Sequence, residues 1–135
     1  MKRVVVTGIG LLTPIGSGRE QFWSELIAGR CGIAPVTSFD TRAFPVHKGA
    51  EVKDFKPDPY FRRRSPEEMG RGSQLAVAAA RMAIEDGGVD LSPYDKIRVG
   101  VSMGTTSGEP QIVERYNDIR KAEGLSSIPK ELSPK

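Results

Sequence analysis

The sequence predicts an α/β protein built in layers, in which amphipathic helices cover a sheet that contains parallel strands. Two apolar runs, residues 3–7 and 98–103, each end at a glycine and are typical of strands buried on both faces. Three segments with apolar residues at helical spacing follow these runs or lie between them. Two strands are too few for a sheet covered by helices on both faces, so we expect the layered fold to be incomplete within this chain.

The first strand, residues 3–7, leads through a glycine-rich turn into the first helix. Ser17 and Glu20 have the spacing of a capping box, in which each side chain bonds the backbone of the other residue. The predicted helix ends at Gly29. Its apolar face consists of Phe22, Trp23, Leu26 and Ile27.

The region between the first and second helices is interrupted by prolines and leaves room for one short strand near 49–52. Ser65 is the predicted cap of the second helix, Pro66 its first residue, and Gly87 and Gly88 its end. One side of this helix is lined by Leu75, Ala76, Ala79, Met82 and Ala83, and so many alanines allow close packing against a neighbour.

The second predicted strand, residues 98–103, leads into the turn 104–108 and then a third helix. Pro110 opens this helix, and it is expected to end near Gly124. Its apolar face consists of Ile112, Val113, Tyr116 and Ile119. The tail 126–135 is polar and carries no signal for a further element.

Composition bounds the class of protein. The 135 residues are 38% hydrophobic and 27% charged, which is ordinary for one soluble domain. No run approaches the roughly 18 apolar residues of a membrane span. The net charge is +3, and basic residues alternate with acidic ones except at Arg62–Arg64, so nucleic-acid binding is disfavoured. The apolar opening breaks at Gly8 without a cleavage site, which favours a cytoplasmic protein over a secreted one.

The chain has one cysteine, Cys31, and one histidine, His47. An internal disulfide is therefore impossible, and a metal site built from Cys and His is nearly excluded. Cys31 follows the C-terminal end of the first helix, a place that disfavours a nucleophilic thiolate. We expect Cys31 to be a small buried residue in a connection and His47 to lie at or near the surface. No cofactor is expected.

The turn Gly8-Ile9-Gly10 after a strand is compatible with a dinucleotide-binding fingerprint. That fingerprint requires a third glycine where this chain has Thr13, and Pro14 follows at a place where the helix should already be running. The helix begins only near Gly18, too late to hold a pyrophosphate beside the turn. A tight structural turn is therefore favoured, with a dinucleotide-binding domain as a remote alternative.

Several motifs along the whole chain resemble the opening of the β-ketoacyl-acyl-carrier-protein synthases, above all the type II condensing enzyme and related polyketide ketosynthases. They occur in order as RVVVTGIG (3–10), TPIG (13–16), FWSELIAG (22–29), GI (32–33), FD (39–40), QLAVAAA (74–80), EDGG (85–88) and VGV (99–101). The resemblance implies a thiolase-like fold, a layered α/β structure with a mixed sheet, of which residues 1–135 form the N-terminal portion of one domain. It also implies a homodimer, or a heterodimer with a related ketosynthase.

The same resemblance implies an acyltransferase of fatty acid or polyketide biosynthesis. Such enzymes elongate acyl chains by decarboxylative Claisen condensation of acyl and malonyl thioesters of an acyl carrier protein, using a cysteine and two histidines. In the family these residues lie beyond position 135, so no catalytic residue is assigned here and the segment alone is expected to be inactive. The alternative is a non-catalytic chain-length factor, which pairs with an active synthase and lacks the cysteine.

Two sets of site residues follow from the resemblance. The first set, Thr106, Ser107 and Gly108, falls where the acyl pocket reaches the dimer interface. A bulky aliphatic residue commonly stands in the place of Ser107 and gates the acyl tunnel, so a serine there implies a different gate. An equally open interpretation is that Ser107 caps the third helix.

The second set, Arg64 and Lys130, falls on positions that face the acidic carrier protein. The sequence departs from the family nearby, with Glu67 and Glu68 where basic residues are frequent. Gly70 and Gly72 also replace an acidic and an aromatic residue. Arg62 and Arg63 can restore the positive charge, and a solvated helix-capping surface is the alternative.

Overall fold

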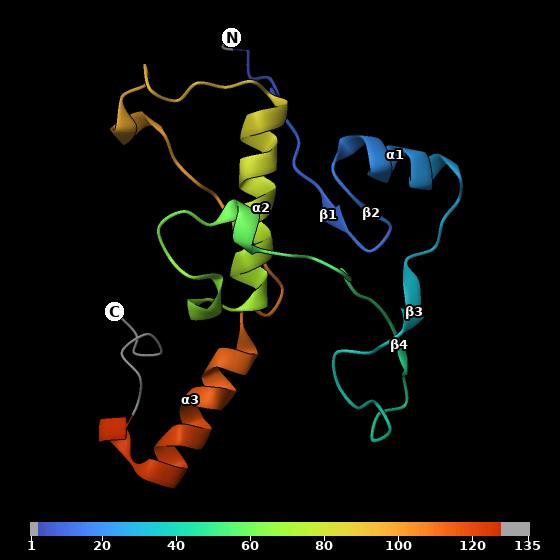
Figure 1. Cartoon of the computed structure of the whole chain (residues 1–135), viewed down its shortest axis with the longest axis vertical. Coiled ribbons are helices and arrows are strands. Elements are labelled where there is room, and N and C mark those ends of the chain that lie inside the picture. Colours follow the sequence, from blue (N-terminus) through green and yellow to red (C-terminus); the bar gives the residue numbers. More distant parts are fainter. Residues whose placement is uncertain (1–2, 128–135) are drawn as a thin grey trace.

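The computed structural model describes residues 3–127, which are arranged around one central helix (Figure 1). This helix, α2, spans Arg71–Asp86. The helix α1, Arg19–Ile27, lies beside its C-terminal half, and α3, Pro110–Glu123, continues beyond its N-terminal end. All three helices lie where the apolar periodicity predicts them.

Two short antiparallel hairpins account for the strands of the described residues. β1, Leu12–Thr13, pairs with β2, Gly16–Ser17, and β3, Ile33–Pro35, pairs with β4, Lys48–Ala50. The strand expected near residue 49 is therefore present as β4. Its partner β3 was not expected because it contains a proline. Short 3₁₀ helices span Asp58–Tyr60, Pro66–Glu68, Lys96–Arg98 and Leu125–Ser127.

The two predicted buried strands are not formed. Residues 3–7 have no regular secondary structure, and Val4 and Val6 are 94% and 83% exposed. Residues 96–98 instead form a 3₁₀ turn, and Val101 in the following segment is 87% exposed. A strand requires a neighbouring strand to accept its hydrogen bonds, and within residues 3–127 neither segment has one.

The first helix begins differently from the prediction. Gly18 is the N-cap, with a φ of 81°, and no side chain caps the helix. The predicted capping box is wrong because Ser17 belongs to β2, where its N–H donates to Oε1 of Gln21 at 3.0 Å. Glu20 forms an ion pair with Arg19 at 2.9 Å instead. The end of α1 is as predicted, since Gly29 adopts a φ of 68° just beyond it.

The predicted start of the second helix at Ser65 and Pro66 is wrong, because these residues belong to a separate 3₁₀ turn and the N-cap of α2 is Gly70. Ser65 Oγ accepts a long hydrogen bond of 3.4 Å from the N–H of Glu67, and Pro66 opens a 3₁₀ turn as expected of a first helical residue. Met69 is then extended, and α2 starts only after Gly70. The Nε2 of Gln74 donates to the carbonyls of Pro66 and Met69, at 2.8 and 3.2 Å, and so ties the turn to the helix.

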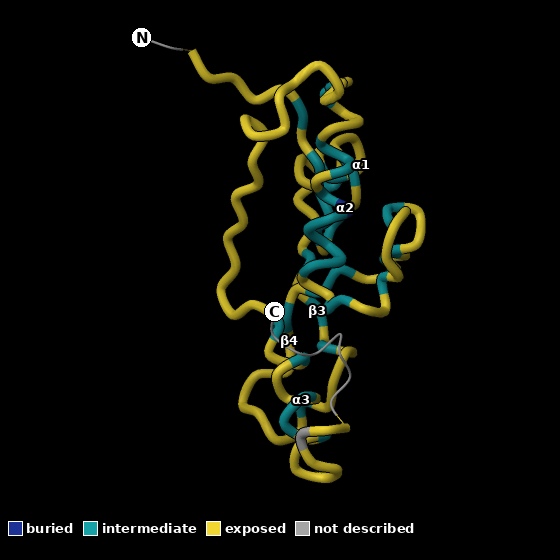
Figure 2. Tube along the Cα trace, turned by 90° about the vertical axis from the view of Figure 1, so that its left-hand side faces the viewer, coloured by how far each residue is buried: buried dark blue, intermediate teal, exposed yellow. Residues whose placement is uncertain are grey.

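The best-buried part of the structure lies along α2. Ala78 is fully buried, and it is the one residue of the described chain that reaches that class. Figure 2 shows partly buried residues along α2 and mostly exposed ones in the long segment before α3. The helix ends at Gly87 and Gly88, and α3 ends at Gly124, as the glycine positions predict.

The glycines of the first turn pack directly against α2. A Cβ on Gly8 would overlap the carbonyl oxygen of Ala83, and a Cβ on Gly10 would overlap that of Ala79. Between them the N–H of Ile9 donates to Oδ2 of Asp86 at 3.0 Å. These glycines therefore permit a backbone-to-backbone approach, which accounts for them without a bound nucleotide.

Candidate functional site

A groove of about 510 Å³ lies where the turn before α3 meets the N-terminal half of α2. One wall is formed by α2 and the other by residues 103–109 and the first turn of α3. Most of the exposed lining is apolar. The lining residues are Gly72, Ser73, Ala76, Met103, Gly104, Thr105, Gly108, Glu109, Ile112 and Val113.

The three residues predicted for an acyl pocket lie on the turn that forms one wall. Gly108 lines the groove, whereas Thr106 and Ser107 are exposed on the same turn and do not line it. The turn is closed by a hydrogen bond of 3.1 Å from the N–H of Gly108 to Oγ1 of Thr105, and Gly108 has a φ of 65°. The N-cap of α3 is Glu109 and no side chain caps the helix, so Ser107 is not its cap.

Glu109 joins the two walls of the groove. Its Oε1 accepts a short hydrogen bond of 2.6 Å from the backbone N–H of Ser73, 36 residues earlier in the chain. Ser73 is in the first turn of α2, whose own N-cap, Gly70, has no side chain to bond these free N–H groups. A carboxylate also interacts favourably with the positive end of the helix dipole.

The carboxylate of Glu109 occupies the space left by two glycines. A Cβ on Gly70 would lie 2.6 Å from each oxygen of this carboxylate, closer than real contacts allow. A Cβ on Gly72 would lie 3.5 Å from Oε1, an ordinary van der Waals distance. Sequence analysis missed Glu109. The sequence does contain a signal for it. Gly70 and Gly72 are unfavourable at the start of a helix, and Gly70 has no side chain to cap it, so an acceptor from elsewhere in the chain could have been expected.

A second cavity, of about 520 Å³, is basic. It is lined by Tyr60, Phe61, Arg62, Arg63, Arg64, Met69, Val77 and Arg81. Arg64 was predicted for carrier docking, and Arg81, which comes from α2, was not. No acidic side chain of the described residues lines this cavity, although Glu67 and Glu68 follow closely in sequence. Lys130, the other predicted docking residue, lies outside the described residues.

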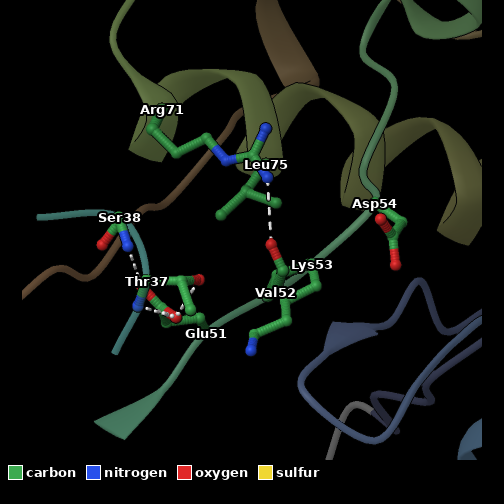
Figure 3. A pocket seen from close by; sticks show the side chains of 8 residues that line it. All are labelled: Thr37, Ser38, Glu51, Val52, Lys53, Asp54, Arg71 and Leu75. Carbon is green, nitrogen blue, oxygen red and sulfur yellow. Dashed lines mark hydrogen bonds between the residues drawn. The ribbon is translucent and has the colours of Figure 1, made fainter. Parts of the chain in front are cut away.

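A third cavity, of about 630 Å³, lies between the hairpin of β3 and β4 and the start of α2 (Figure 3). Glu51 accepts hydrogen bonds from the N–H and hydroxyl of Thr37, at 2.9 and 3.0 Å, and from the N–H of Ser38 at 3.0 Å. Hydrogen bonds from Ser38 and Thr37 lower the pKa of Glu51 from 4.5 to about 2. The carboxylate thus joins the segment that follows β3 to the segment that follows β4.

Arg71 closes the other side of this third cavity. Its Nη2 donates to the carbonyl of Val52 at 3.0 Å, and its guanidinium lies 4.7 Å from the centre of the Phe55 ring. The arrangement holds the segment after β4 against α2. Because Glu51 and Arg71 are both engaged in such contacts, we interpret this cavity as structural.

Neither Cys31 nor His47 belongs to a reactive cluster. Cys31 is exposed, so its predicted burial is wrong: the connection between α1 and β3 runs over the surface. His47 is exposed as expected, with Nδ1 3.2 Å from Oγ1 of Thr41. Residues 3–127 contain no group of three His, Cys, Asp or Glu side chains placed to hold a metal ion. No helix in this range combines the length and apolar character needed to cross a bilayer.

Comparison with known proteins assigns the family. The family model described as "Beta-ketoacyl synthase, N-terminal domain" matches residues 1–133. The chain belongs to the β-ketoacyl synthase family. Among its relatives, a 3-oxoacyl-[acyl-carrier-protein] synthase 2 of Coxiella burnetii is 36% identical over 134 residues, which cover 98% of this chain and 31% of that protein. A synthase of the same name from Synechocystis is 37% identical over 125 residues, 93% of this chain and 30% of the relative.

A solved structure agrees with this assignment to the β-ketoacyl synthases. The ishigamide ketosynthase/chain length factor is 36% identical and superimposes with a TM-score of 0.81, covering 95% of this chain and 32% of that one. The thiolase-like fold expected from the resemblance is therefore confirmed. The chain spans about a third of the length of these relatives. The match also favours the synthase interpretation over a dinucleotide-binding domain.

Proposed function

We propose that residues 1–135 are the N-terminal portion of one synthase domain, in a protein that elongates acyl chains. The reaction is a decarboxylative condensation of acyl and malonyl thioesters of an acyl carrier protein. The family match over residues 1–133 carries this proposal. The isolated cysteine and histidine of this chain do not supply a catalytic centre. In such a synthase the catalytic cysteine and histidines lie outside residues 1–135, and we expect the segment alone to be inactive.

The groove between α2 and the turn before α3 fits an acyl chain. Ala76, Met103, Ile112 and Val113 give it apolar walls, and apolar surface is what a hydrocarbon tail requires. Ser107 is exposed on the same turn and does not line the groove. The proposal is that a larger side chain at this position reaches the groove and narrows its entrance.

The test of the groove is Ser107→Ile in the full-length protein, with kcat/KM measured for a short and a long acyl carrier thioester. One methylene of pocket space alters discrimination roughly 10- to 200-fold, and isoleucine adds more than that. Ser107→Thr, which keeps the hydroxyl and adds one methyl group, should shift the ratio in the same direction but less. Equal long-to-short ratios in the wild type and the isoleucine variant would remove Ser107 from the acyl gate.

The basic cavity fits docking of an acidic carrier protein. Arg62, Arg63 and Arg64 come from the segment before α2, and Arg81 adds a fourth guanidinium from the helix itself. Positive charge gathered around a partly apolar surface accelerates encounter with an acidic partner at low salt. Arg81 is the one of the four whose backbone belongs to a regular helix, so we expect its position to be the most rigid.

The docking test compares charge reversal at Arg64, Lys130 and Arg81 in the full-length protein. We expect slower association with the carrier at low ionic strength, and a smaller difference at high ionic strength. Arg115→Glu, an exposed position on α3 with the same change of charge, is the control. Association that slows equally in the control would show a general charge effect and would contradict local docking.

A second candidate function is a non-catalytic chain-length factor, which is supported by the similarity to the solved ishigamide ketosynthase/chain length factor. The two candidates differ in whether the full-length protein takes an acyl group on a cysteine. Incubation with an acyl carrier thioester, followed by intact mass measurement, distinguishes them, since a chain-length factor gains no acyl mass. The same measurement under native conditions tells a homodimer from a heterodimer. A cytoplasmic location remains a prediction.

A further inference from the structure

We propose that Glu109 is a positioning residue that sets the width of the acyl groove, by holding the turn 104–108 against the N-terminus of α2. This inference rests on the proposed function of that groove. It does not make Glu109 a catalytic residue, since nothing places it at the reacting atoms.

The first step of the argument is that Glu109 is the link between the two walls. Within residues 3–127, its 2.6 Å bond to the Ser73 N–H is the one hydrogen bond that joins residues 104–109 to α2. The other hydrogen bond of the turn, from Gly108 to Thr105, is internal and fixes its shape only. Loss of the glutamate therefore leaves the turn intact but releases it from the helix.

The second step is that the start of α2 is shaped to receive this carboxylate. Gly70 has ordinary backbone angles, φ −70° and ψ 163°, so its conformation does not require glycine. The glycine leaves space for the carboxylate: a Cβ at position 70 would meet both carboxylate oxygens at 2.6 Å, so an alanine there would force the flexible Glu109 side chain to move away. An N–H bonded to a charged acceptor is stronger than a neutral pair, and the carboxylate also satisfies a helix donor that no local side chain caps.

The third step connects the link to the groove. Ser73 and Gly72 belong to the α2 wall, whereas Gly108 and Glu109 belong to the opposite wall, and all four line the same space. The length of the bond between Ser73 and Glu109 thus fixes the separation of the walls at that end. A longer separation admits a bulkier or longer acyl chain, so Glu109 acts on substrate preference through the position of the turn.

The test uses the full-length protein and four variants. Glu109→Ala removes the link, and Gly70→Ala displaces the carboxylate from the other side while leaving Glu109 in place. Both are expected to change the ratio of kcat/KM for long and short acyl thioesters in the same direction, by about tenfold. Glu109→Gln keeps an acceptor oxygen for the Ser73 N–H, so this variant should keep a long-to-short ratio close to that of the wild type. Gly100→Ala is the matched control, because a Cβ at Gly100 meets no atom within 4 Å and Gly100 does not line the groove.

A double variant and a second measurement complete the design. Glu109→Ala combined with Gly70→Ala should shift the ratio no further than Glu109→Ala alone, since the two changes break one contact. Amide hydrogen exchange at Ser73, whose N–H loses its acceptor, should become faster in both single variants and stay unchanged in Gly100→Ala. This second readout needs no activity, so it holds even where the protein proves to be a chain-length factor.

The outcomes separate the two claims. A wild type without condensing activity, in which exchange still rises on Glu109→Ala and Gly70→Ala, refutes the proposed function but supports the link. An active wild type whose long-to-short ratio is unchanged by both substitutions overturns the positioning role. Additive effects in the double variant, or an equal effect of Gly100→Ala, overturn it as well.

Discussion

Substitution of Gly10 by alanine tests whether the N-terminal segment is held against α2 by direct backbone packing. The added Cβ would overlap the carbonyl oxygen of Ala79 and lie 2.7 Å from the backbone N of Ala83. Overpacking at a well-packed contact costs about 1–3 kcal/mol. The obstacle here is helix backbone, which cannot rotate away as a side chain does. We therefore expect the upper end, about 3 kcal/mol, or a more than hundredfold change in the unfolding equilibrium.

The assay is urea unfolding of the full-length protein, read as a lower midpoint at unchanged slope. Gly100→Ala is the control, because a Cβ at Gly100 meets no atom within 4 Å. Adding Ala79→Gly to the Gly10 variant should restore nothing, since the clash is with the carbonyl oxygen and not with the alanine methyl. The reasoning is refuted if the Gly10 and Gly100 variants unfold at the same urea concentration, or if Ala79→Gly rescues the former.

Three further predictions follow from contacts elsewhere in the chain. The pKa of Glu51, about 2 in the folded protein against 4.5 ordinarily, means that its contribution to stability is complete above pH 4.5 and is lost as the pH falls toward 2; an acid-unfolding profile of Glu51→Gln that matches the wild type would contradict this. Asp86→Ala removes the acceptor of the Ile9 N–H and the partner of Arg19, so thermal unfolding should show a loss of about 1–3 kcal/mol, larger than for Arg19→Ala, whose side chain is 57% exposed. Residues 1–135 made alone should self-associate, because Val4, Ile97 and Val101 are at least 87% exposed; a sharp, reversible thermal transition of a monomer would count against that.

The helices could be predicted from sequence because their determinants are local. Apolar spacing, Pro110 and the terminal glycines place α1, α2 and α3 without reference to the rest of the chain. The strands predicted at residues 3–7 and 98–103 are wrong, because neither segment forms a strand in the described part of the chain. Their apolar residues indicate burial, but the hydrogen bonds of a strand are made with other segments, and residues 3–127 provide no partner for either.

The candidate site was predicted in part, for a similar reason. Arg64 and Gly108, which the resemblance named, line the basic cavity and the groove, and the roles assigned to them stay predictions. Arg81 was missed because it reaches the basic cavity from a different element, 17 positions further on than Arg64. Glu109 was missed because the helix that it caps begins far away in sequence. Contacts between distant segments define both cavities, and a pattern read along one segment does not contain them.

Two neighbouring residues at the start of α2, Ser73 and Gln74, each form a hydrogen bond to a segment outside the helix. Gln74 holds the segment that carries Met69, which lines the basic cavity, and Ser73 holds Glu109, which lines the acyl groove. The site proposed to meet the carrier and the site proposed to hold its cargo therefore rest on one shared helical turn. A substitution at Gln74 would disturb both, and a change in acyl preference on replacing it would be no proof that Gln74 contacts the acyl chain.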